Sequence, residues 1–558
     1  MSRAFELLPS VDEDGVGSYS RASLDLGESV SYDDFRRKSD AESVASLIGR
    51  NEFDTDLKKE KEDNNAPLRV SLKQYSTLVW WMLAMSTAIL YGGYDSVILG
   101  TLNAVPAYQR DFGEPTGDPE EPDLIPAFWL SIWDGLGPLG QIAGSALGGW
   151  FLDRYGRRFC LRMGSIFGAF AIGILFLANM PANKNGKRIM ILVGKVVQGF
   201  GLGIIKIETF TYMSEVIPLM SLVPTFTLLG QLIGAIVIFV VSNDDRSLSY
   251  MIALGSQWAL ALPPFLLAFF LPESPAYLLK IKDTPGALKS FERLLGPKND
   301  ARAAVLKMQK TLDEEAKSSV KLSYTDCFNA ANRRRTFIVV FASCIEFFFG
   351  LSLLSSVSYF LQKLGMDASK SILFLIAGIV IGLVANAGST WTVTHIGRRK
   401  LTITTLLITC GLWTVMGFAG IKQLSFTPWL AGGLCTSIVV VCGLGCWPAS
   451  YAIMGETSSI RLRSRTQAIG SLANNVSGIV MNFGLPYVYN TDAANLGAKT
   501  GFIFTALAGM GAVMTYFFVP ELKGRSAIEI DHLFQKGVRS IGSSSWRDSE
   551  EAVPLNDA

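Results

Sequence analysis

The sequence predicts an all-α membrane protein with twelve transmembrane helices in two six-helix halves. Of its 558 residues, 49% are hydrophobic and 18% are charged, and the mean hydropathy is +0.32. Apolar runs of about 20 residues, the length that crosses a bilayer core, recur along the chain. Because hydrocarbon cannot pair exposed backbone groups, such runs form helices. A set of motifs that occurs twice divides these helices into two halves.

Twelve apolar runs are the expected spans. In chain order they cover residues 77–99, 126–152, 159–179, 188–210, 222–242, 250–271, 336–361, 369–393, 401–420, 428–454, 466–489 and 500–520. At about 1.5 Å per residue, each is long enough to cross a hydrocarbon core of about 30 Å.

Three motifs occur twice, in one order and at nearly one offset. The matching positions are Gly156 and Gly397 in G-R-R motifs, Glu215 and Glu456, and Glu273 and Glu521. The first two pairs are both separated by 241 positions (397 − 156 and 456 − 215), and the third by 248 (521 − 273). This duplication is typical of secondary transporters built from repeats, in which the substrate site lies where the halves meet.

The apolar runs and the segments between them divide the chain into five parts. These are a polar tail at 1–71, a first membrane half at 72–271, a helical bridge at 272–335, a second half at 336–520 and a tail at 521–558. The first tail is rich in Ser, Asp, Glu and Lys and lacks apolar periodicity, so we expect it to be disordered. In the bridge, Thr284 and Pro285 begin a predicted helix that ends at Gly296.

The placement of charge predicts the orientation. Arginines follow the second, eighth and tenth spans and precede the seventh, whereas the loop at 101–125 is acidic. Because basic loops stay in the cytosol, both termini and the bridge are expected to be cytosolic. Because the first 70 residues are polar, we do not expect a cleavable signal peptide there.

Other classes of function find no support in the sequence. The seven cysteines are scattered without C-x-x-C spacing, so neither a disulfide framework nor a zinc or other metal site is predicted. No nucleophile–base set or phosphate-binding loop points to an enzyme or to a cofactor. The expected partners are a small-molecule substrate and the lipid bilayer, without nucleic acid, and the expected state is a monomer.

Charged residues in the repeated motifs predict a gate at the cytosolic helix ends. The candidates are Asp153, Arg157, Arg158, Glu215 and Glu273 in the first half and Arg398, Arg399, Glu456, Glu521 and Arg525 in the second. We expect charge-assisted hydrogen bonds between these helix ends when the protein opens outward. The alternative is that the charges only set the topology. Because Thr394 stands where the first copy has Asp153, the two gates are expected to differ in strength.

The chain resembles the sugar-porter branch of the major facilitator superfamily over about residues 72–540. The shared motifs are G-Y-D in the first span, G-x-x-x-D-R-x-G-R-R, G-K-x-x-x-G-x-G-x-G, Y-x-S-E-x-x-P, P-E-S-P and P-E-x-K-G-R. The second half is most similar to fungal α-glucoside (maltose-type) permeases, through S-S-V-S-Y-F, E-T-S-S-I-R-L-R and L-P-Y-V-Y-N. The resemblance implies the major facilitator fold and, by itself, a fungal source.

Ionisable residues inside the expected spans are functional candidates because they are costly in the membrane. Asp95 and Lys195 lie at similar depths in the first and fourth spans. In the proton-coupled sugar porters that the chain resembles, an aspartate in G-Y-D carries the proton and an arginine in helix 4 modulates it. Here the helix 4 residue is Lys195, so the partner is a point charge and not a fork. The alternative for Asp95 and Lys195 is a structural ion pair. Lys206 and Glu208, further along the fourth span, are either central charges or gate charges.

The seventh span departs from the pattern of the family it resembles. The family reads Q-Q-x-x-G-x-N, and this chain reads E-F-F-F-G-L-S from Glu346. Glu346, Phe347 and Ser352 therefore replace amides that bind sugar hydroxyls in the family, and Tyr451 replaces a tryptophan of the tenth span. A break at Gly350 could bring Glu346 toward the substrate.

Other polar and aromatic residues could compensate for the lost amides. Ser352, Ser355, Ser356 and Tyr359 recur at helical spacing and predict one polar stripe. Its alternative is packing between helices by small residues. Trp447 and Asn475 are further expected substrate ligands, because indoles and amides bind sugars. Asn386, Asn474, Asn482 and Trp391 are additional candidates.

From these observations and the resemblance, we predict a plasma-membrane sugar transporter that works by alternating access, is coupled to protons and carries an α-glucoside or a related hexose derivative. One alternative is a transporter, including an exporter, of a sugar-derived secondary metabolite. A second is a sugar sensor that does not transport, against which the short segment after the last span argues.

Overall fold

The structure is a computed structural model. It describes residues 76–115, 123–216, 223–242, 246–296, 301–319, 324–329, 332–422, 425–458, 462–525, 527–543 and 546. These all fall within one compact unit, Arg69–Ala558. The tail at 1–71, for which we expected disorder, lies outside the described residues.

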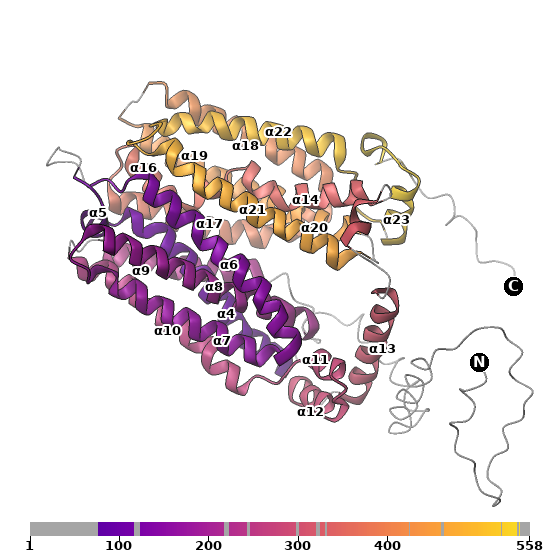
Figure 1. Cartoon of the computed structure of the whole chain (residues 1–558). Coiled ribbons are helices and arrows are strands. Elements are labelled where there is room, and N and C mark those ends of the chain that lie inside the picture. Colours follow the sequence, from indigo (N-terminus) through magenta and orange to yellow (C-terminus); the bar gives the residue numbers. More distant parts are fainter. Residues whose placement is uncertain are drawn as a thin grey trace, which may run out of the picture. The chain divides into compact units, whose positions relative to one another are not determined.

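Six long helices form the first half (Figure 1). They are α4 (Ser76–Thr101), α6 (Ala127–Tyr155), α7 (Arg157–Phe176), α8 (Lys184–Val216), α9 (Val223–Val241) and α10 (Ser247–Phe270). Between α4 and α6 lie a short 3-10 turn, Leu102–Ala104, and α5 (Pro106–Phe112). Each long helix coincides with one of the expected spans.

The second half repeats this arrangement with two of its helices broken. It consists of α14 (Arg333–Phe348), α15 (Leu351–Ser355), α16 (Val357–Lys363), α17 (Ala368–His395), α18 (Arg398–Ala419), α19 (Thr427–Leu444), α20 (Cys446–Thr457), α21 (Arg463–Tyr489) and α22 (Gly501–Phe518). The expected seventh span is thus three helices, and the tenth is two. Gly350 breaks the seventh with a left-handed φ of +91°, as the sequence predicted, and Gly445 breaks the tenth.

Short helices lie at one end of the bundle, together with the bridge between the halves (Figure 1). They are α11 (Pro275–Lys280), α12 (Thr284–Leu295), α13 (Ala301–Ser319) and α23 (Ala527–Gln535). The predicted helix in the bridge is confirmed as α12. The carboxylate of Asp283 caps its first turn, and Gly296, with φ +72°, ends it. We call this the α12 end, and the opposite end, which carries α5, the α5 end.

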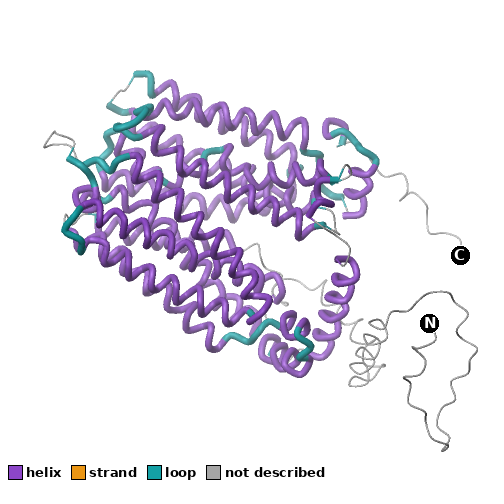
Figure 2. The backbone as a smooth tube through the Cα atoms, viewed as in Figure 1, coloured by secondary structure: helices purple, strands orange, loops and turns teal. Residues whose placement is uncertain are grey.

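Nine helices of the described residues are long and apolar enough to cross a membrane. The three expected spans that do not meet this criterion are α6, α21 and the broken helix α14–α16. Helix α14 has only 16 residues, and α21 is interrupted by polar residues such as Asn474 and Asn475. Polar or broken helices are tolerated in a membrane where they face protein or a water-filled space. Figure 2 shows that all these rods are helical and run along one common direction.

Glycine allows the helices of the first half to pack closely. Helix α6 lies against α8, and a Cβ atom at Gly144 would lie 2.1 Å from the carbonyl oxygen of Phe200. A Cβ atom at Gly203, on the facing side, would lie 2.3 Å from the carbonyl oxygen of Gln141. Between membrane helices, association depends on such close packing, because lipid supplies no hydrophobic driving force.

The halves meet along two pairs of helices. Helix α6 packs against α21, and α9 packs against α17. A buried apolar cluster continues across this boundary and includes Trp133 of the first half and Tyr489 of the second. All seven cysteines lie in the described part of the chain and are free thiols.

The glycine contact between α6 and α8 gives a first prediction. We expect Gly144→Ala to lower the free energy of unfolding by about 1–3 kcal/mol, because the added carbon would push two backbones apart. The measurement is the midpoint of thermal unfolding of the purified protein in detergent. Gly411→Ala in α18 is the control, since a Cβ atom there meets nothing within 4 Å. Equal midpoints for the two variants would contradict the prediction.

Candidate functional site

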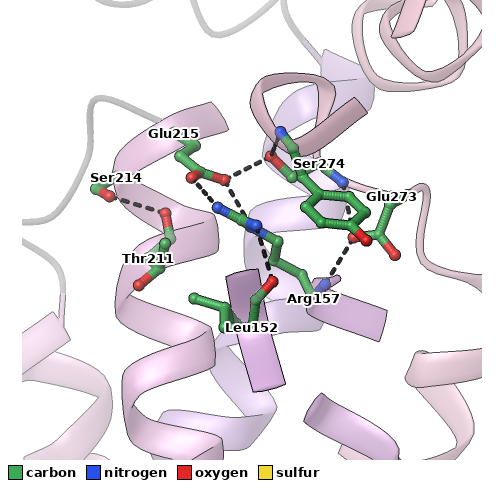
Figure 3. Close-up of polar contacts among 8 residues, drawn as sticks. Leu152, Arg157, Thr211, Ser214, Glu215, Glu273 and Ser274 are labelled. Atoms are coloured by element: carbon green, nitrogen blue, oxygen red, sulfur yellow. Dashed lines mark hydrogen bonds and ion pairs between the residues drawn. The ribbon is translucent and has the colours of Figure 1, made fainter. Parts of the chain in front are cut away.

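An arginine at the start of α7 joins three helix ends at the α12 end of the first half. The Nε of Arg157 donates to Glu215 at the end of α8 at 3.1 Å, and its terminal nitrogen pairs with the other oxygen of that carboxylate. The backbone N–H of Arg157 donates to Glu273, just before α11, at 2.8 Å. Figure 3 shows these contacts, with Ser274 bonded to Glu215 and the carbonyl of Leu152 receiving the remaining arm of the guanidinium.

The local backbone explains why this arginine reaches both carboxylates. Gly156, with φ +86°, ends α6 and turns the chain directly into α7. A Cβ atom there would lie 2.8 Å from the carboxylate of Glu273, so only glycine leaves room for it. Arg158 supports the same corner by donating to the carbonyl of Phe269 at 2.7 Å.

The second half contains the same triad. The Nε and a terminal nitrogen of Arg398 donate to Glu456 at 3.2 and 2.8 Å, and its backbone N–H donates to Glu521 at 2.9 Å. The remaining terminal nitrogen of Arg398 donates to the carbonyl of Val393, which is the counterpart of Leu152. Arg399 donates to the carbonyl of Tyr516, just as Arg158 donates to that of Phe269. The duplicated motifs therefore form duplicated contacts.

The two triads differ in geometry. Arg157 contacts both oxygens of Glu215, whereas both nitrogens of Arg398 contact a single oxygen of Glu456. The other oxygen of Glu456 has no partner among the residues that the structure describes. The side chain of Arg157 is 1% exposed and that of Arg398 is 16% exposed. A bidentate, better buried pair is the stronger arrangement. The expected difference in gate strength, which was based on Thr394 standing in place of Asp153, stays a prediction.

Two residues that the sequence grouped with the triads lie outside them. Asp153 is exposed and has no hydrogen-bond or ion-pair partner among the described residues. Its pairing with the arginines is therefore absent from this structure. Arg525 donates instead to the backbone of Ser543 and, at 2.9 Å, of Trp546, so it holds the segment after α23 in place. Burial lowers the pKa of this guanidinium.

The intramembrane charges of the first half are arranged differently from the expected Asp95–Lys195 pair. The ammonium of Lys195 forms an ion pair with Asp134 of α6 at 3.0 Å. Asp95, which is 5% exposed, accepts a hydrogen bond from the amide of Gln198, and the same amide donates to Gln257 of α10. The charge of Lys195 also acts on Asp95, so two carboxylates share one cation.

In the second half, a carboxylate lies just before the break at Gly350. Glu346 of α14 accepts a hydrogen bond at 2.8 Å from Asn474 of α21, which also donates to the carbonyl of Ser343 at 2.6 Å. Tyr451 of α20 interacts electrostatically with Glu346, and its side chain is 55% exposed although it lies in a membrane helix. These contacts bring α14, α20 and α21 to one polar site.

The other expected substrate residues do not all reach this site. Trp447 lies one turn from Tyr451 on α20 and packs 6.1 Å from Phe349, measured between ring centroids. Phe347 of α14 lies near Gly478 of α21, where an added Cβ atom would be 3.3 Å from its ring. Asn475 is half-buried and has no hydrogen-bond partner among the described residues.

The predicted stripe of Ser352, Ser355, Ser356 and Tyr359 is not continuous. The chain breaks between α15 and α16, with Ser356 at the junction, so helical spacing does not persist across it. Ser352 is buried, the hydroxyl of Ser355 donates to its own helix, and the hydroxyl of Tyr359 donates at 3.2 Å to Asn490. The single-stripe expectation is therefore wrong, because a helical period holds only within one unbroken helix.

Hydrogen bonds between the halves gather at the α5 end. The side chains of Gln109 and Gln362 are bonded at 3.0 Å, and Gln362 also donates to the carbonyl of Ala104 at 2.7 Å. Asn490 donates to the carbonyl of Ile125 at 3.0 Å, beside a further contact from the backbone of Ala127 to Asp492.

A further cross-half hydrogen bond, 3.0 Å long, joins Asn386 of α17 to Thr225 of α9 and lies toward the α12 end.

Sequence reasoning missed several residues of these sites. Asp134 was detectable, because it is an acidic residue inside an expected span. Gln198 and Gln257 carry a weaker signal, since a neutral amide does not have the high cost of a charge in the membrane.

A helical membrane bundle of two repeated halves, with ionic triads at one end and intramembrane charges between, defines a membrane transporter of the secondary type. The family model described as "Sugar (and other) transporter" matches residues 80–534. The chain belongs to this family, which confirms the predicted resemblance.

Individual relatives agree with this family. The chain is 30% identical over 529 residues to an α-glucosides permease, MPH3, of Saccharomyces cerevisiae, with 90% of this chain and 85% of the permease covered. It is also 30% identical over 482 residues to the MFS transporter fmqE of Aspergillus fumigatus, covering 80% of this chain and 83% of that protein.

Among solved structures, an inward open conformation of the xylose transporter XylE from E. coli has a TM-score of 0.66 at 21% identity, covering 82% of this chain and 99% of XylE. This likeness confirms the major facilitator fold. The protein is a multi-pass membrane transporter and not an enzyme.

The unequal triads give a second prediction. We expect Arg157→Ala to lower the midpoint of thermal unfolding in detergent more than Arg398→Ala, by the equivalent of at least about 1 kcal/mol. The reason is that breaking a better buried, bidentate pair leaves a more costly unpaired carboxylate. Arg157→Lys should lie between wild type and Arg157→Ala, because an ammonium cannot make the fork. An equal or larger loss in Arg398→Ala would refute the difference.

Proposed function

We propose that the protein is a proton-coupled transporter of an α-glucoside or a related hexose derivative, working by alternating access in the plasma membrane. The observation that carries this proposal is the 30% identity to an α-glucosides permease along 90% of the chain. The polar site around Glu346, at a broken helix in the middle of the bundle, supports it, because transporter sites are built at discontinuous helices. The chain acts as a monomer in this proposal.

The α12 end faces the cytosol in this proposal. It carries the basic motifs that contain Arg157 and Arg398, and basic loops remain cytosolic. Both chain termini then lie in the cytosol as well. In that orientation the cross-half bonds of Gln362 and Asn490 lie on the outer side, whereas the bond between Asn386 and Thr225 lies toward the cytosol. The greater number of outer bonds among the described residues supports an inward-facing state.

The triads hold each half together. Because they are formed in this inward-facing state, they differ from the expected gate, whose bonds would form when the protein opens outward. Each arginine joins helix ends of its own half, so the halves move as rigid bodies against one another. The outer contacts between the halves are made by neutral amides and by the carboxylate of Asp492, and each is worth on the order of 1–3 kcal/mol. Contacts of this size favour the inward-facing state while keeping the free energy of the outward-facing state low enough for it to be populated.

Asp95 carries the coupled proton in this mechanism. Its carboxylate is buried, is held by Gln198, and shares the cation Lys195 with Asp134. When Asp95 is ionised, Lys195 is drawn toward it, and when Asp95 is protonated, Lys195 returns to Asp134. The exchange changes the contacts between α4, α6 and α8, which couples the proton to the position of the helices.

A transport assay tests the proposal. The purified protein in liposomes should take up radiolabelled maltose in counterflow and concentrate it when the outside is acidic. An unrelated amino acid serves as the control substrate. Counterflow of no sugar would overturn the proposal, and accumulation driven only by the opposite proton gradient would favour the exporter.

The role of Asp95 gives a third prediction. We expect Asp95→Asn to abolish accumulation driven by a pH gradient while leaving counterflow exchange within about threefold of wild type, because exchange needs no net movement of protons. Asp283→Asn is the matched control, since asparagine caps a helix as well as aspartate does. If Asp95→Asn still concentrates sugar, Asp95 does not carry the proton.

A further inference from the structure

Lys206 is a charged residue of α8 that the triads and the proton site leave unused. It lies ten residues before Val216, the last residue of α8 (216 − 206), which places it about 15 Å inside the helix. Its side chain is exposed, and it has no hydrogen-bond or ion-pair partner among the described residues. An unpaired ammonium at this depth is expensive unless it faces a polar, water-filled space.

The charged group that acts on Lys206 is Glu346, from the other half of the protein. The charges of the two side chains act on each other, but they form no direct ion pair. Glu346 lies 13 residues after the start of α14 at Arg333 (346 − 333), or about 20 Å, which is a similar depth. Asn474 holds one oxygen of Glu346 at 2.8 Å.

Two aromatic residues of α20 complete this site. Tyr451 is 55% exposed and interacts electrostatically with Glu346. The indole N–H of Trp447 is buried beside Tyr451 and forms no hydrogen bond of normal geometry among the described residues. A buried donor without a partner costs free energy that a ligand hydroxyl can recover. The site therefore contains the ammonium of Lys206 as a donor, the carboxylate of Glu346 as an acceptor, and the indole N–H of Trp447 as a second donor.

We propose that Lys206 is a substrate-contacting residue that, with Glu346, makes the central site selective for neutral polyhydroxylated ligands over hexuronates and hexosamines. The ammonium donates to one hydroxyl and the carboxylate accepts from another, so the ligand bridges the two halves. A charged sugar meets one attractive and one repulsive group and still loses the hydration of its own charge. This inference rests on the proposed function.

Charge variants test this selectivity by competition in maltose counterflow, with glucose, glucuronate and glucosamine as competitors at a pH where the amine is protonated. The wild type should prefer glucose. Lys206→Gln leaves Glu346 as the one charge of the pair, and it should raise the apparent affinity for glucosamine, relative to that for glucose, by at least tenfold. Glu346→Gln leaves Lys206 as the one charge of the pair, and it should raise the apparent affinity for glucuronate, relative to that for glucose, by a similar factor. The double variant removes both charges and should again prefer glucose, with lower affinity.

Matched controls separate this role from a structural one. Lys187→Gln removes a lysine near the α5 end of α8, which donates to Asn179 at 2.6 Å, and should leave the ranking unchanged. Lys206→Arg and Glu346→Asp keep both charges and should keep the wild-type ranking, which tests the proposal even if a glutamine variant fails to fold.

The outcomes distinguish the two proposals. Maltose transport by the wild type with no opposite shift in Lys206→Gln and Glu346→Gln would overturn the inference and leave the proposed function intact. An altered ranking in Lys206→Arg would also overturn it. Counterflow of no sugar by the wild type would overturn the proposed function and this inference with it.

Discussion

The contact between a guanidinium and two carboxylates, made once in each half, is the interaction on which the arrangement of this protein depends. Arg157 and Arg398 each join helix ends that are far apart in the sequence. Each contact fixes the helices of one half relative to one another, which lipid alone would not do, so that the half behaves as one rigid unit. Because the partners lie within a half, the contact leaves the boundary between the halves free to rearrange.

The boundary between the halves uses weaker chemistry. At the α5 end it consists of amide side chains and backbone groups, such as the bond between Gln109 and Gln362. In the middle it consists of opposite charges that face each other without touching, Lys206 and Glu346. Strong ionic contacts inside the halves and modest contacts between them are what a transporter with two accessible states requires.

The departures from the family pattern are concentrated in the second half. The lost amides of the seventh span are replaced by Glu346, which Asn474 positions from α21. A carboxylate can accept two hydroxyls where an amide oxygen and nitrogen would accept and donate, so the donors must come from elsewhere. In the proposed site, Lys206 and the indole N–H of Trp447 supply these donors in place of the usual amides.

Apolar length and repeated motifs were sufficient to predict the fold from the sequence, because a bilayer admits few structures and a duplication gives the same contacts twice. The helix end at Gly296 and the break at Gly350 were readable from the sequence, since glycine marks positions of left-handed backbone, whereas no helix end was predicted at Gly156. Contacts between distant helices carry no such local signal.

Only the tertiary structure therefore decided that Lys195 pairs with Asp134 rather than Asp95, that Arg525 holds the C-terminal segment, and that Ser356 interrupts the serine stripe. Depth along a helix can be counted from the sequence, but the direction in which a side chain points depends on how the helices rotate and cross. Packing of neighbouring helices sets that rotation, and it places Lys206 opposite Glu346.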